Sequence, residues 1–181
     1  MPNSPPPQRW QVAIVLGVGV LAVSTAAIWI RLAIEAAGMR GAGFSLFLAA
    51  TRLTLASSIL LPIQWHNVWR SPASAPLSRS AIACAVAAGL FLALHFATWI
   101  TSLSYTSIAA STTLVTTNPL WVTLLSWVVY KDVPPRSAAI GMAIALVGGI
   151  LVGVGGGDSG GSQPWLGNAL ALVGSWTVSI Y

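Results

Sequence analysis

The chain has 181 residues, of which 56% are hydrophobic and only 6% are charged. A typical soluble domain has about 25% charged residues, so 8 basic and 3 acidic side chains cannot cover a water-exposed surface. The net charge of +5 does not indicate nucleic-acid binding, because the basic residues stand singly between apolar runs. We therefore expect the chain to be surrounded by a lipid bilayer.

The order of apolar runs predicts the architecture. The polar, proline-rich start MPNSPPPQRW predicts a disordered tail over residues 1–11. The next run is too long for the apolar part of a signal peptide, so we expect an uncleaved first helix. A bilayer core needs about 20 apolar residues as helix, and lipid cannot satisfy unpaired backbone groups. We predict an all-α membrane bundle with six spans and a Gly-rich linker at 155–164, the spans being 12–30, 43–63, 80–101, 106–130, 137–154 and 165–181.

Basic residues near the span ends predict the orientation. With the N-terminus in the cytoplasm, the cytoplasmic segments hold five basic residues and the opposite segments hold two, which favours that orientation in the cell membrane. The five are Arg9, Arg70, Arg79, Lys131 and Arg136, against Arg31 and Arg40. Arg31 and Glu35 are one helical turn apart, and we expect them to form an ion pair at the membrane interface.

The fourth run contains STTLVTTNPLWVTLLSW, residues 111–127, which combines many hydroxyl groups with an Asn-Pro pair. Pro119 removes a backbone N–H and clashes with the carbonyl of Val115, so we predict a kink or hinge there. The wide polar band around Thr116, Thr117 and Asn118 predicts the lining of a cavity. The alternative is that these hydroxyls bond back to their own helix, as Ser and Thr often do.

Arg52 and His95 are the ionisable residues predicted at membrane depth. Arg52 lies about nine residues from the nearer end of its span, roughly 13 Å, so it needs a wet cavity, helix carbonyls, or an acid or anion that is not present in this chain. His95 lies deep in the third run, with Trp99 on about the same side. It suits either substrate binding or a hydrogen-bonding spacer.

Nothing in the sequence indicates an enzyme, a metal site or a cofactor. The motifs HExxH and the Gly-Lys phosphate loop are absent, and the single cysteine, Cys84, has no partner for a disulfide or metal site. A separate pattern in the fifth run predicts helix packing, because small residues every four positions form a smooth face. These are Gly141, Ala145, Gly149 and Gly153, and they suit packing within the chain or a dimer.

Residues 89–153, GLFLALHFATWITSLSYTSIAASTTLVTTNPLWVTLLSWVVYKDVPPRSAAIGMAIALVGGILVG, resemble the EamA domain of the drug/metabolite transporter superfamily. The resemblance is carried by the pattern of SL, YTS, NP and W, by the short basic turn, and by ATRL at 50–53. It implies one of two inverted five-helix repeats around a substrate cavity lined by Arg52, His95, Trp99, Thr116, Thr117 and Asn118. The chain departs from the family pattern at Ser104 and at Tyr130-Lys131, where acids are common.

The sixth run is interpreted as the first helix of an incomplete second repeat. Residues 166–180 can be laid over residues 16–30 with an offset of 150, which fits the expected repeat length. The resemblance therefore implies a transporter of small organic molecules that works by alternating access, with the chain as one half. The alternatives are a half-transporter completed by a second copy and a membrane scaffold that transports nothing.

Overall fold

The computed structural model describes residues 8–70, 78–155 and 161–181, and for 67–70 and 153–155 it describes the backbone only. Within these residues the chain is all helical, as predicted. The helices are α1 (Arg9–Ala37), α2 (Ala42–Arg70), α3 (Arg79–Tyr105), α4 (Ile108–Val115), α5 (Asn118–Tyr130), α6 (Arg136–Gly155) and α7 (Pro164–Ile180). Among the described residues, three helices are long and apolar enough to cross a membrane: α1, the Ala42–His66 part of α2, and α3.

Local sequence signals define most helix ends. Gln8 and Gln11 form a capping box at the start of α1, so residues 9–11, predicted within the tail, are helical. Residues 1–7 of the predicted tail lie outside the described residues. Gly38 ends α1 with a φ of 63°, a left-handed conformation that glycine adopts without strain. Pro164 opens α7 in the first turn, where a missing N–H is harmless.

The fourth predicted span, 106–130, is two helices instead of one. α4 ends at Val115 and α5 begins at Asn118, so the break lies at Thr116–Thr117. Pro119 then falls in the first turn of α5, where it needs no hydrogen-bond partner. Proline therefore disrupts the helix at its N-terminal side, where its ring would meet the carbonyl of Val115.

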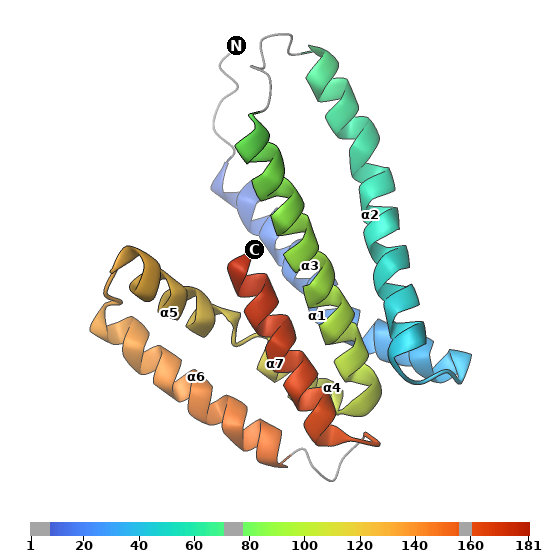
Figure 1. Cartoon of the computed structure of the whole chain (residues 1–181), viewed down its shortest axis with the longest axis vertical. Helices are drawn as coiled ribbons and strands as arrows, with labels where there is room; N and C mark the ends of the chain where they lie inside the picture. The colour runs from blue at the N-terminus through green and yellow to red at the C-terminus, as the bar shows by residue number, and fades with distance from the viewer. Residues whose placement is uncertain (1–7, 71–77, 156–160) are drawn as a thin grey trace.

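α3 and α7 form the centre of the bundle. They lie side by side and have the most extensive packing of any helix pair, with α2 on one side and the α5–α6 hairpin on the other (Figure 1). The close approach comes from small residues on α7: Gly167, Ala171 and Gly174 are all buried. A Cβ atom added at Gly167 would lie 2.6 Å from the Cβ of Thr106.

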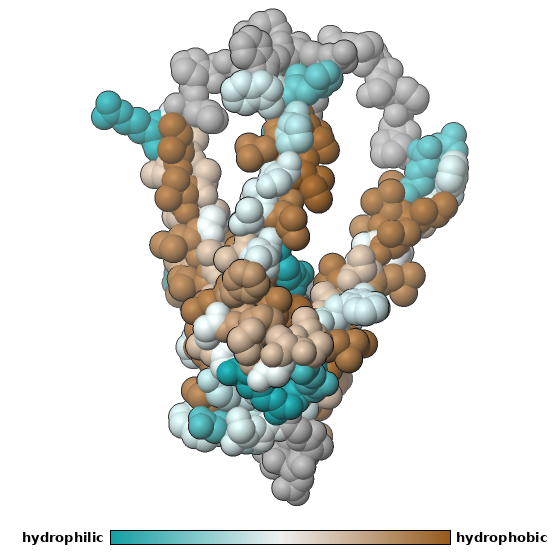
Figure 2. Space-filling view, turned by 90° about the vertical axis from the view of Figure 1, so that its right-hand side faces the viewer, coloured by the Kyte–Doolittle hydropathy of each residue, from teal (hydrophilic) through white to brown (hydrophobic). Residues whose placement is uncertain are grey.

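The remaining core joins α1, α2 and α3 at one end of the bundle. It contains Ile30 and Ile34 of α1, Ala49 of α2, and Ile100 and Leu103 of α3. Further along, the same three helices expose apolar side chains over most of their length (Figure 2). This exposed surface is too apolar for water, and it suits contact with lipid acyl chains.

The predicted ion pair at the end of the first span is confirmed. Arg31 Nε lies 2.9 Å from Glu35 Oε1. The same guanidinium donates hydrogen bonds to the carbonyl oxygen of Leu103 and, at 3.3 Å, to that of Thr106. The side chain therefore binds carbonyl groups at the C-terminal end of α3, which its charge favours.

Candidate functional site

Arg52 of α2 faces the aromatic side chains of α3. Its guanidinium carbon lies 5.3 Å from the ring centroid of Phe96 and 5.9 Å from that of Trp99. The side chain is half-buried, and its Nη1 atom is buried without a hydrogen-bond partner among the described residues. The rings attract the positive charge, but they do not replace the hydrogen bonds that a buried guanidinium requires.

His95 links this group to α7. Its ring stacks on Trp99 with centroids 5.9 Å apart and an interplanar angle of 17°. Its Nδ1 atom lies 2.8 Å from the carbonyl oxygen of Gly174. A carbonyl oxygen only accepts, so Nδ1 carries the hydrogen of this bond. Arg52, His95, Phe96 and Trp99 together are called the arginine–aromatic cluster below.

Three threonines of the fourth predicted span bond to carbonyl groups of the preceding helical turn. Thr116 is exposed, and its hydroxyl donates to the carbonyls of Thr112, at 2.9 Å, and Thr113, at 3.0 Å. Thr112 and Thr123 likewise donate to carbonyls four residues earlier. For these side chains the structure matches the alternative interpretation of the polar band.

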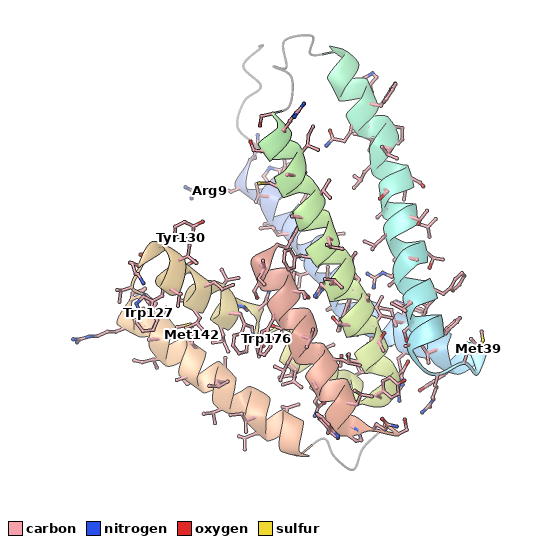
Figure 3. All side chains as sticks on the ribbon, in the orientation of Figure 1. Arg9, Met39, Trp127, Tyr130, Met142 and Trp176 are labelled. Carbon is pink, nitrogen blue, oxygen red and sulfur yellow. The ribbon has the colours of Figure 1, made fainter. Side chains whose placement is uncertain are left out.

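Thr117 instead joins α5 to α7. Its buried hydroxyl lies 2.6 Å from the carbonyl oxygen of Leu114 and 3.1 Å from Ser175 Oγ, and it accepts a hydrogen bond of 3.1 Å from Trp121 Nε1. Trp121 packs edge-on against Trp176 of α7, which points toward α5 (Figure 3). The neighbouring Asn118 is half-buried, and its main-chain carbonyl accepts a hydrogen bond from Ser179.

Two cavities lie beside α5. One has a volume of about 500 Å³ between α5 and α6 and is lined mainly by apolar side chains, including Trp127 and Met142 (Figure 3). The other, of about 380 Å³, reaches Thr117, Trp121, Gly149 and Asn168. Thr117 is the predicted pathway residue that lines one of them.

The structure thus divides the predicted pathway residues into two groups. Arg52, His95 and Trp99 come together between α2, α3 and α7, whereas Thr117 lies at the junction of α4, α5 and α7. Both groups meet α7 at consecutive residues, Gly174 and Ser175. The role of these residues in a substrate pathway stays a prediction.

One residue of the small-residue pattern on α6, Gly149, packs against another segment of the chain. Gly149 is buried, and a Cβ added there would lie 3.7 Å from Thr117 Cγ2. A Cβ at Gly141 would meet nothing within 4 Å, and Ala145 is exposed. The surroundings of Gly153 lie outside the described residues. Packing by the rest of this face therefore stays a prediction.

Several interhelical contacts were not predicted from the sequence. Ser104 Oγ lies 3.0 Å from Ser45 Oγ on α2, and both side chains are buried. Thr106 donates a hydrogen bond of 2.8 Å to Asn168 of α7. The small residues at positions 167, 171 and 174 were the available signal that α7 packs closely on another helix.

Comparison with known protein families decides the identity at family level. The model of the EamA-like transporter family matches residues 10–154. The chain belongs to this family. The match confirms the resemblance inferred from the sequence, and it makes this EamA-like chain a membrane protein. No curated protein and no solved structure matches the chain.

The EamA-like region contains all four residues of the arginine–aromatic cluster and also Thr117. Gly174 and Ser175, the α7 residues that contact these two groups, lie beyond residue 154. The helix that connects the two groups is therefore outside the part of the chain that the family model matches.

Proposed function

We propose that the chain is one half of a transporter that moves small organic molecules across the cell membrane by alternating access. The observation that carries this proposal is the arginine–aromatic cluster, which brings a charged side chain and a histidine together between three helices of a membrane bundle. Charged residues in membrane segments are expensive and commonly serve transport pathways. Membership of a transporter family supports the same conclusion.

The break between α4 and α5 serves as the hinge in this proposal. Alternating access requires one group of helices to move relative to another around the substrate site. Residues 116–117 separate two short helices, and Pro119 prevents them from joining into one. The α5–α6 hairpin can then tilt while α4 stays packed against α7.

For the same transporter we propose a cytoplasmic N-terminus. The supporting observation is the excess of basic residues in the segments that would then face the cytoplasm. Residues 164–180 would represent the first helix of a second repeat, so a single copy of the chain would provide only part of the substrate cavity.

The test uses leucine substitutions in a family member that has both repeats. At the positions that match Arg52 and His95, leucine removes charge and hydrogen bonding but keeps an apolar side chain of useful size. We expect each change to lower solute flux into proteoliposomes at least tenfold, while leucine at the position of the exposed Thr25 of α1 leaves flux within twofold. Unchanged flux in the first two variants would mean that both residues only pack.

The chain itself provides a second test. Proteoliposomes that contain single copies of residues 1–181 are expected to show no solute flux above empty liposomes. Rapid flux by single copies would contradict the proposal that the chain is half of the transporter. Flux that rises with the square of protein density would instead support completion by a second copy.

A further inference from the structure

Two buried hydrogen-bond donors in the arginine–aromatic cluster have no partner. They are Arg52 Nη1 and Trp99 Nε1, and these two side-chain atoms are the buried and unsatisfied ones among the described residues. Buried polar groups are nearly always hydrogen-bonded, because an unmade bond leaves the desolvation penalty uncompensated. Two such donors on neighbouring side chains therefore indicate a missing acceptor.

The charge of Arg52 is also unmatched. Of the two acids that the structure describes, Glu35 is paired with Arg31, and Asp132 is exposed after the end of α5. The aromatic rings of Phe96 and Trp99 attract the guanidinium through their faces but accept no strong hydrogen bond from it. The missing acceptor is therefore expected to carry negative charge.

The neighbouring groups narrow the chemistry further. The guanidinium carbon lies 5.9 Å from the Trp99 ring centroid, so the two side chains that carry the donors are direct neighbours. A carboxylate offers two oxygen atoms in a plane, which suits an arginine and a second N–H donor. The ring of Phe96, which is only half-buried, offers a stacking surface to the rest of an aromatic ligand.

We propose that Arg52 and Trp99 bind the carboxylate of a small aromatic acid, which makes organic anions the substrate class of this transporter. The proposal rests on the transport function proposed above and specifies its substrate. Since Nη1 and Nε1 are both covered by neighbouring side chains, the ligand reaches them when Arg52 changes rotamer. The Arg52 side chain is only half-buried, so part of it already lies at the surface of the bundle.

The test measures binding of benzoate and of benzamide to the purified chain in detergent micelles at low salt. Benzamide has nearly the shape of benzoate but no charge, so the comparison isolates the carboxylate. Equilibrium dialysis of the radiolabelled compounds against protein-free micelles corrects for partitioning into detergent. We expect saturable benzoate binding and at least tenfold weaker benzamide binding.

Three variants identify the donors. Arg52→Gln should weaken benzoate binding at least tenfold, which corresponds to about 1.4 kcal/mol. Trp99→Phe keeps an aromatic ring but removes the N–H group, and we expect it to weaken benzoate binding threefold to fivefold. Arg79→Gln removes an exposed charge at the start of α3 and should leave binding unchanged. Equal binding of the two probes, or full benzoate binding by Trp99→Phe, would overturn the proposal.

An acidic side chain on another helix or on a second copy would supply the same chemistry. In that case the wild-type chain binds no benzoate and Arg52→Gln changes the size of the complex on gel filtration, a result that overturns the proposal. If Arg52→Gln does not fold, Arg52→Lys and Trp99→Phe decide the question. Benzoate binding by the chain, together with no solute flux through a family member that has both repeats, would contradict the transport function. Flux through that family member with no benzoate binding by the chain would contradict only this inference.

Discussion

Replacing Gly167 by alanine would place a methyl group directly against α3. The added carbon would lie 2.6 Å from Thr106 Cβ, 2.7 Å from its backbone nitrogen and 2.9 Å from its Cγ2. Because non-bonded carbon atoms prefer separations of about 3.5–4.0 Å, α7 has to move outward by roughly 1 Å. Thr106 caps the C-terminal end of α3, and neither its backbone nitrogen nor its Cβ moves when its side chain rotates. A side-chain rotation therefore cannot relieve the contact.

Overpacking of this kind costs about 1–3 kcal/mol. Alanine also forms helix more readily than glycine, by about 1 kcal/mol, and this gain partly hides the loss. Gly141→Ala provides the matched control, since the added methyl group meets nothing within 4 Å. The free energy of unfolding should therefore be about 1–3 kcal/mol lower for Gly167→Ala than for Gly141→Ala.

The measurement is unfolding by sodium dodecyl sulfate in mixed micelles, followed by tryptophan fluorescence. The Trp121–Trp176 pair, with ring centroids 5.2 Å apart, reports on separation of α5 and α7. Gly174→Ala should give an intermediate result, because the added carbon would lie 3.1 Å from Thr98 Oγ1, a side-chain atom. Equal unfolding midpoints for Gly167→Ala and Gly141→Ala would refute the close packing of α7 on α3.

Three further changes test other contacts. Pro119→Ala should join α4 to α5, because alanine restores a backbone N–H at this position. Amide hydrogen exchange at residues 116–120 should then slow about tenfold. Unchanged exchange would mean that the proline does not cause the break. Ser102 Oγ and Ser111 Oγ lie 2.6 Å apart and both side chains are buried, so Ser102→Ala leaves the Ser111 hydroxyl buried without that partner. This change should lower the unfolding free energy by about 1–3 kcal/mol. Replacing both serines by alanine should recover part of the loss. Arg31→Gln should cost about 1.5–3 kcal/mol through its lost bonds to carbonyl groups, whereas Arg40→Gln, at an exposed position, should change the unfolding free energy by less than about 0.5 kcal/mol.

Helix positions could be predicted from the sequence because apolar run length and breaker residues are local signals. The Pro119 break follows from the geometry of one residue, although it lies at Thr116–Thr117, just before the proline. The span predicted over 106–130 is divided into α4 and α5 for the same reason, because Pro119 interrupts the backbone hydrogen bonds there.

Contacts between helices could not be predicted in the same way. His95 Nδ1 meets the carbonyl of Gly174, 79 residues later, and backbone carbonyls carry no sequence signal. Small residues recur at helical spacing in both α6 and α7, yet Gly167 packs closely whereas Gly141 does not. The spacing reveals a smooth face, but the arrangement of the whole bundle decides whether another helix covers that face.

Consecutive residues of α7 are tied to different parts of the bundle, Gly174 to α3 and Ser175 to α5. Successive residues on an α-helix point about 100° apart, so α7 cannot follow one neighbour through a rotation without straining its bond to the other. In the proposed transport cycle, a swing of the α5–α6 hairpin against α1–α3 would therefore apply torque to the C-terminal half of α7. This helix, which lies beyond the residues that the family model matches, is bonded to both sides of the bundle.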